Sequence, residues 1–348
     1  MNSRNAVVAA AIFAALTGHM TSSLAHHGPP NEPLYDTTEP VVFDGEITEV
    51  FWRNPHARFR IRVTDGPNEG EIWEIETNPV GILLRTGFTT DLLPIGSSVK
   101  VAGVVSRGRP QSMALYNLLL PNGYEFADAA RPRPLRFSEQ RLSSELLAVD
   151  VAKVQAATRD ARGIFRVWSR SLNRQSRLDL DNLTPAAQAA RAAFNRADDP
   201  ILDCVADGMP RGMLHPPPIS FSDEGDRIIL RAAEHDLVRT IHMTADADPR
   251  DQPATPLGYS VGRWEDVNTL VVTTSRVDWP YSDANGTPQS DVAMHLERFT
   301  LSDDDTKLVY ELTTIDPPYL IGPAVRGAEF TWDPSREIEP YNCALWDE

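Results

Sequence analysis

The sequence predicts a mainly β protein with two barrel-like domains joined by a helical linker. Segments of alternating hydrophobicity fill residues 40–126, and strand-like segments separated by Asp, Gly and Pro turns fill residues 201–348. The region between them, residues 127–200, contains two segments that favour helix. At 348 residues the chain exceeds one typical domain. We therefore expect an N-terminal β domain at residues 26–126, the linker, and a C-terminal β domain.

Residues 57–63 carry the clearest strand pattern of the first domain. Phe59, Ile61 and Val63 alternate with three arginines, which is the period of two expected for a half-buried strand. A short helix is predicted at residues 80–86, after the third of five strands, and this order favours a small closed barrel of the OB type. The four other strands are predicted at residues 41–51, 71–76, 98–105 and 114–120.

The linker is predicted to contain two helices. Residues 138–162 lack Gly and Pro and favour a first helix. For the second helix, Thr184 can cap the amino end, Pro185 suits the first turn, and an Ala-rich stretch runs to Arg196. Between the two helices, residues 163–170 could supply the first strand of the next domain.

Five strands are predicted in the C-terminal domain, with no helix between them. Strands at this spacing favour an antiparallel barrel or a sandwich, and both remain open. The interior is either a packed core or a site for a small-molecule ligand, as in some eight-stranded barrels. The five strands cover residues 227–232, 237–243, 269–275, 293–301 and 307–315.

The chain is acidic, with a formal net charge of −16. Such a protein is repelled by nucleic-acid phosphates and by anionic lipid headgroups, so neither partner is expected. The longest apolar stretch, residues 6–16, is far shorter than the roughly 20 residues of a bilayer-spanning helix. We therefore expect no membrane span, and the sequence leaves the oligomeric state open.

Residues 1–25 have the pattern of a cleavable signal peptide. Arg4 provides the positive charge at the start, residues 6–16 form the apolar core, and Ser23 and Ala25 are the small residues before the cleavage point. The alternative is an N-terminal helix that packs on the domain. We expect cleavage after Ala25 and a periplasmic or secreted protein.

The chain contains two cysteines, Cys204 and Cys343. In an oxidising compartment they can form a disulfide that ties the start of the C-terminal domain to its end. Two free buried thiols are the alternative, and export favours the disulfide.

Cleavage after Ala25 would place His26 at the new N-terminus. Its free amine and its imidazole can chelate one metal ion, and such nitrogen ligands suit copper best among first-row metals. His56 is the candidate for a further imidazole ligand, and His27 is a second candidate. The terminus, and the terminus alone, resembles the histidine brace of periplasmic copper carriers and copper oxygenases. The alternative is an exposed terminus that binds no metal.

An acid–base site in the C-terminal domain is a second functional hypothesis. His242 would act there with Arg239, Arg263 or Asp316, because a histidine, an arginine and a carboxylate inside a barrel can bind or protonate a small molecule. On the outer face the same residues would form solvated ion pairs. The sequence has no motif of a standard hydrolase or NTPase. A structural envelope protein without a ligand is the third interpretation.

Two parts of the chain resemble uncharacterised bacterial sequences. In residues 25–126 the resemblance is to the DUF6152 family, and it comprises Ala25-His26-His27, Gly45 to Asn54-Pro55-His56, Leu83 to Gly87, Leu92 to Gly96 with Ile95 inserted, and Leu120 to Gly123. The C-terminal part is similar to an exported β-rich module in Gly208-Met209-Pro210-Arg211, Gly262-Arg263-Trp264-Glu265 and Tyr341-x-Cys343, although Asp266-Val267-Asn268 replaces the usual Gly-Asp turn. Both resemblances imply an exported protein of two domains, and neither implies an activity.

Overall fold

A computed structural model of the chain describes the two β regions and parts of the segment between them. The predicted signal peptide, His26 and His27 lie outside the described residues. The described residues are 35–128, 133–143, 150–170, 178–195, 199–214, 218–244 and 248–344.

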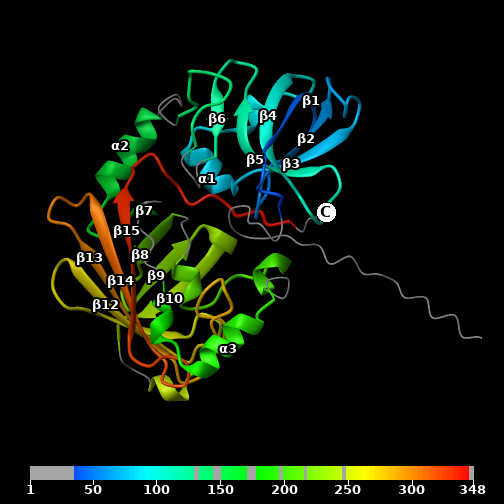
Figure 1. Cartoon of the computed structure of the whole chain (residues 1–348). Coiled ribbons are helices and arrows are strands. Elements are labelled where there is room, and N and C mark those ends of the chain that lie inside the picture. Colours follow the sequence, from blue (N-terminus) through cyan, green and yellow to red (C-terminus); the bar gives the residue numbers. More distant parts are fainter. Residues whose placement is uncertain are drawn as a thin grey trace, which may run out of the picture.

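The N-terminal region forms a closed barrel of five strands, in which β3 pairs with both β2 and β5 (Figure 1). The central strand is β1, which pairs antiparallel with β2 and β4, and β6 extends the sheet beside β5. Helix α1 (Val80–Arg85) follows the third strand, as predicted. The strands are β1 (Val41–Phe51), β2 (Arg58–Val63), β3 (Ile72–Glu76), β4 (Ser98–Val105), β5 (Ser112–Leu119) and β6 (Glu125–Ala127).

Hydrophobic alternation explains the core of this barrel. Phe59, Ile61 and Val63 of β2 are buried, together with Ile47 of β1. Closure also needs a strand residue without a side chain, because a Cβ at Gly103 of β4 would lie 2.1 Å from the Ala114 carbonyl oxygen.

The segment between the two barrels is less helical than predicted. Helix α2 (Val151–Asp160) begins after Asp150, whose side chain accepts a hydrogen bond from the Lys153 amide at 3.1 Å. The described residues 138–143 are not helical, because the Leu142 amide donates to the Glu125 carbonyl of β6 at 2.8 Å. Tertiary pairing therefore overrides helix propensity in this part of the predicted helix.

Helix α3 (Pro185–Ala193) begins as the sequence predicts, with Thr184 Oγ1 accepting from the Ala187 amide at 3.3 Å. The residues before it include β7 (Val167–Arg170), which pairs with strands of the second barrel. Short 3₁₀ helices are η1 (Thr90–Leu92), η3 (Leu180–Asn182), η5 (Pro200–Asp203), η6 (Arg211–Met213), η7 (Glu234–Asp236) and η8 (Pro249–Asp251).

The C-terminal region forms a closed barrel of nine strands, which decides between the barrel and the sandwich. Neighbouring strands are antiparallel except β10 and β11, which are parallel. Strands β8, β11 and β15 lie outside the predicted strands. In β15, a Cβ at Gly327 would lie 2.8 Å from the Tyr310 carbonyl oxygen. In addition to β7, the strands are β8 (Ile219–Asp223), β9 (Arg227–Ala232), β10 (Leu237–His242), β11 (Tyr259–Trp264), β12 (Thr269–Ser275), β13 (Met294–Leu301), β14 (Lys307–Ile315) and β15 (Ala324–Trp332).

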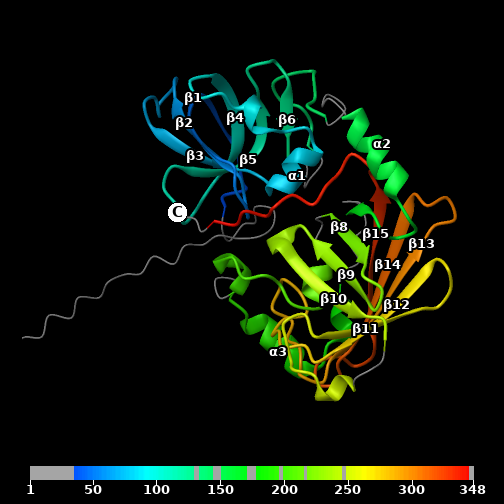
Figure 2. The ribbon, with the colours of Figure 1, turned by 180° about the vertical axis from the view of Figure 1, so that it is seen from behind.

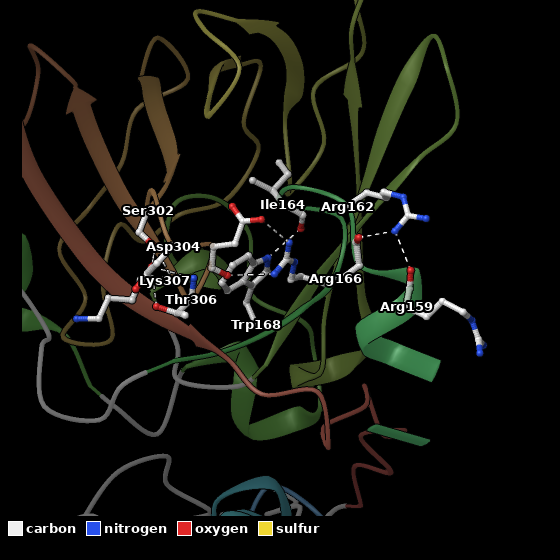
Figure 3. A network of polar contacts seen from close by, with 11 residues as sticks. Arg159, Arg162, Ile164, Arg166, Trp168, Ser302, Asp304, Thr306 and Lys307 are labelled. Carbon is white, nitrogen blue, oxygen red and sulfur yellow. Dashed lines mark hydrogen bonds and ion pairs between the residues drawn. The ribbon is translucent and has the colours of Figure 1, made fainter. Parts of the chain in front are cut away.

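The side chains of Arg166 and Trp168 lie beside each other in the C-terminal barrel (Figure 3). The Arg166 guanidinium lies 5.4 Å from the Trp168 ring and 4.4 Å from the Trp332 ring, and it donates to the Asp305 carbonyl at 3.0 Å. The Trp168 indole donates to the Ile164 carbonyl at 2.8 Å. Arg166 is therefore held against two aromatic rings and a backbone carbonyl.

A C-terminal segment, residues 333–344, connects the second barrel to the first, and we call it the strap (Figures 1 and 2). The predicted disulfide between Cys204 and Cys343 is present. On the N-terminal barrel, the Asn54 amide donates to the Asn342 carbonyl at 3.2 Å and the Ala344 amide donates to the Asn54 carbonyl at 2.9 Å. In the described part of the chain, no helix is both long and apolar enough to cross a membrane.

Candidate functional site

The N-terminal barrel holds a buried cluster around His56, in the turn between β1 and β2. Glu76, the last residue of β3, accepts a hydrogen bond from the Tyr35 hydroxyl at 2.8 Å through Oε2. Its other oxygen, Oε1, lies 2.7 Å from His56 Nδ1. The side chains of His56 and Glu76 are 9% and 4% exposed. One carboxylate therefore joins a tyrosine and a histidine that come from different parts of the barrel.

Electrostatics fix the direction of these hydrogen bonds. Burial and the charge of Glu76 raise the pKa of Tyr35 far above 10.0, so its hydroxyl stays protonated and donates. Because an ionised carboxylate can only accept, His56 Nδ1 donates to Glu76. An imidazole that donates to a carboxylate through Nδ1 is oriented to bind a metal through Nε2.

Asn54 holds the turn that carries His56. Its side-chain oxygen accepts from the Val80 amide at the start of α1 at 3.0 Å, and its side-chain nitrogen donates to the Tyr341 carbonyl of the strap. With the two backbone hydrogen bonds to the strap, the backbone amide, the backbone carbonyl and both polar side-chain atoms of Asn54 all have hydrogen-bond partners. The asparagine of the Asn-Pro-His element therefore positions the chain, and the histidine two residues later is the group with metal-binding chemistry.

The structure does not test the predicted metal site as a whole. His26 and His27 lie outside the described residues, so only His56 has a position. Within the described ranges, no three His, Cys, Asp or Glu residues are grouped so that they could hold a metal ion. A site at His56 would need ligands from elsewhere, and His26 remains the predicted one.

The structure separates the predicted acid–base residues of the C-terminal barrel. Arg239 points into the barrel and His242 to its outside, because the two lie three residues apart on an alternating strand. The His242 ring stacks on Tyr259 of the neighbouring strand, with the ring centroids 4.6 Å apart. The hypothesis of an interior site built on His242 is therefore corrected.

Arg263 and Asp316 do not join Arg239 either. The Arg263 side chain is 64% exposed and lies 3.8 Å from the Glu265 carboxylate. Asp316 is buried after β14, where its carboxylate accepts hydrogen bonds from the Ser290 amide and hydroxyl. Each of these residues therefore has a local structural partner instead of a common site.

A buried polar layer inside the C-terminal barrel contains Arg239 and residues of five other strands. The Arg239 guanidinium forms two hydrogen bonds with the Glu297 carboxylate, one of them at 2.9 Å, and it donates to Ser260 at 3.0 Å. Tyr310 donates to Glu297 at 2.9 Å. The polar layer consists of Arg239 (β10), Ser260 (β11), Thr274 (β12), His295 and Glu297 (β13), Tyr310 and Thr314 (β14) and Arg326 (β15).

Three groups of the layer, Arg239, His295 and Tyr310, have pKa values shifted away from neutral pH. Although burial opposes its charge, contact with Glu297 raises the pKa of Arg239. Burial, reinforced by the charges of Arg326 and Arg239, lowers the pKa of His295 to about 3, so this imidazole is neutral. Burial and Glu297 raise the pKa of Tyr310 well above 10.0. These groups can donate and accept hydrogen bonds, but they are poorly suited to exchange protons at pH 7.

The sequence contains a signal for part of this layer. His295 and Glu297 have the same parity as the buried Phe299, so alternation places them on the inner face of β13. Arg326 has no such signal, because β15 was not among the predicted strands.

Comparison with known proteins supports the N-terminal resemblance. Residues 14–113 match the model of DUF6152, a family of unknown function. The match ends within β5, so the second barrel lies outside it. No curated protein is significantly similar to the chain. The family description assigns no ligand and no activity.

Proposed function

We propose that the protein is exported and that its mature form binds Cu(II) at the N-terminal barrel. The ligands would be the amine and imidazole of His26 and the imidazole of His56, with His27 as a further candidate. The observation that carries this proposal is the contact between Glu76 and His56 Nδ1 at 2.7 Å.

A carboxylate behind a histidine is the usual support of a metal-binding imidazole. It fixes the tautomer, orients the ring and makes the opposite nitrogen more basic. Glu76 provides this support, and its second oxygen is held by Tyr35. The His56 ring is therefore oriented by the protein before any metal arrives, which lowers the entropic cost of binding.

The chain between His26 and the barrel is long enough to reach His56. Tyr35 marks the start of the described chain, and its hydroxyl contacts the same carboxylate as His56. The nine residues from His26 to Tyr35 span at most roughly 30 Å when extended. A much shorter path suffices if they fold back toward Glu76.

Two observations support export. Residues 1–25 have the pattern of a signal peptide, and the two cysteines of the chain form a disulfide. Structural disulfides persist in the periplasm and outside the cell. We therefore propose a periplasmic or secreted location.

The test begins with the N-terminus of the secreted protein, determined by mass spectrometry. If it is His26, calorimetry should give one Cu(II) per chain, and the electron paramagnetic resonance spectrum should show nitrogen ligands. Adding one alanine before His26, or replacing His56→Asn, should weaken binding. His242→Asn is the matched control, because that residue stacks on the outside of the other barrel.

Unchanged Cu(II) affinity in both the extended protein and the His56→Asn variant would overturn the proposed site. A mature N-terminus at another residue would have the same consequence. Absence of any metal uptake would leave a structural envelope protein as the better interpretation.

A further inference from the structure

At one end of the polar layer, a histidine and an arginine contact the same hydroxyl group. His295 Nδ1 lies 3.1 Å from Thr314 Oγ1, and Arg326 Nη2 donates to the same oxygen at 3.4 Å. His295 and Arg326 are 0% and 3% exposed. Thr314 therefore links a histidine of β13 and an arginine of β15 inside the barrel.

Each of the two side chains has a buried nitrogen without an acceptor. Among the residues that the structure describes, neither His295 Nε2 nor Arg326 Nε has a hydrogen-bond partner. Buried polar atoms in proteins are nearly always paired with protein, ordered water or a ligand. Two such atoms on neighbouring side chains therefore indicate a place where something accepts hydrogen bonds.

Both unpaired atoms are donors. An arginine can only donate, so Thr314 Oγ1 accepts from Arg326, and the hydroxyl proton is available for His295 Nδ1. A neutral imidazole that accepts at Nδ1 carries its proton on Nε2. The bound group must therefore accept from Arg326 Nε–H and from His295 Nε2–H.

The local charge favours an anion. Arg239 is neutralised by Glu297, with which it forms two hydrogen bonds. Arg326 has no such carboxylate: its other acceptor is the Ser282 carbonyl at 2.8 Å, and no described residue forms an ion pair with it.

The carboxylate whose charge acts on Arg326 is Asp283, and it is bound to other residues. Asp283 lies 2.6 Å from Arg191 and accepts from the Thr287 hydroxyl at 2.9 Å. The positive charge of Arg326 therefore lacks a direct counter-ion, and burial makes an unbalanced charge costly.

We propose that this end of the C-terminal barrel binds a small carboxylate, with His295 Nε2 and Arg326 Nε as two of its donors. The ligand must be small, because Arg239, Glu297 and Tyr310 fill the rest of the same polar layer. This site is independent of the proposed copper site, since it lies in the other barrel and requires neither His26 nor His56.

Formate is the probe for this site, and formamide is the matched control ligand of the same shape without charge. In the wild-type protein labelled with ¹⁵N at histidine, the His295 Nε2 resonance should shift saturably as formate is added. Formamide should bind about tenfold more weakly or worse, because it lacks the charge that Arg326 balances. The other histidine resonances should not follow the formate titration.

Variants locate the site. Arg326→Gln and His295→Gln should abolish the saturable response to formate, whereas Arg263→Gln on the exposed face should leave it unchanged. If the first two variants do not fold, the ligand comparison in the wild-type protein still decides the question. No response of His295 to formate, or an equal response to formamide, would overturn the proposal and assign the two donors to buried water.

Discussion

The two barrels of this protein use their interiors differently. The N-terminal barrel has an apolar core. Its buried polar cluster around the Glu76 carboxylate lies where β3 ends, next to the turn that carries His56. The C-terminal barrel is apolar and aromatic at one end and polar through the layer around Arg239. A barrel of five strands has room only for a packed core, whereas a wider barrel of nine strands can accommodate a hydrogen-bonded network. The candidate functional side chains therefore lie at the rim of the small barrel and in the interior of the large one.

The largest expected effect concerns the charge pair in the large barrel. Glu297→Gln leaves the Arg239 guanidinium buried without its counter-charge, so we expect a loss of about 3–5 kcal/mol in the free energy of unfolding. The matched control is Glu265→Gln, which breaks an exposed pair with Arg298 and should leave the free energy of unfolding nearly unchanged. Urea unfolding measures both. Similar costs for the two variants would contradict a desolvated network.

The strap provides the second test, because it joins the two barrels. Replacing both cysteines by serine opens a bridge between residues separated by 139 positions and should lower stability by about 2–5 kcal/mol. Asn54→Ala should cost about 1–3 kcal/mol in the disulfide-bonded protein, because it removes buried hydrogen bonds to the strap and to α1. If the disulfide holds the strap against Asn54, the cost of Asn54→Ala shrinks in the double-serine background. Strictly additive costs in the unfolding experiment would show that the two features act independently.

The third test addresses the rim of the small barrel and depends on the proposed copper site. Glu76→Gln removes the carboxylate that orients His56, so Cu(II) affinity should fall by about 10–100-fold. Glu49→Gln is the control, because Glu49 forms an exposed pair with Arg60. Calorimetric titration of both variants, after circular dichroism has verified their folding, separates a positioning role from a general loss of structure. Equal affinity for Glu76→Gln and wild type would remove Glu76 from the site.

The last test is a pH dependence from the interior of the large barrel. The pKa of His295 is about 3 in the folded protein and near 6.5 when unfolded, so between these values the unfolded chain binds the proton and the folded chain does not. The contribution of His295 to stability is therefore complete above pH 6.5 and declines as the pH falls toward 3. The slope from this group is at most about 1.4 kcal/mol per pH unit. His295→Gln should show a shallower loss of stability on acidification, and an unchanged slope would contradict a buried neutral imidazole.

Much of the fold could be predicted because hydrophobic alternation is local. Residues 41–51, 98–105 and 269–275 are strands with the predicted limits, and the helix after the third strand is present. The prediction of a helix at residues 138–143 was wrong. These residues pair with β6, and helix propensity carries no information about such a tertiary contact. Strand β15 was not predicted, because Gly327 and a buried arginine interrupt its alternation of hydrophobic and polar residues.

The candidate sites were less predictable because their partners are distant in sequence. Arg239 and Glu297 are 58 residues apart, and only strand order brings them into contact. The alternation of β10 separated Arg239 from His242, but it did not reveal which of them would face a counter-charge. His56 could be singled out from its sequence, whereas its support by Glu76 and Tyr35 depends on barrel closure.

The contacts of Asn54 affect how the first barrel can be studied in isolation. A fragment that ends after β6, the last strand of the first barrel, would leave out residues 341–344, and the Asn54 amide and carbonyl would then face water instead of the strap. The turn bearing His56 would lose one of its two anchors and retain the one to Val80. Metal affinities measured on such a fragment would describe a looser loop than the intact molecule contains. The limits of a sequence family and the limits of a self-sufficient folding unit differ in this protein.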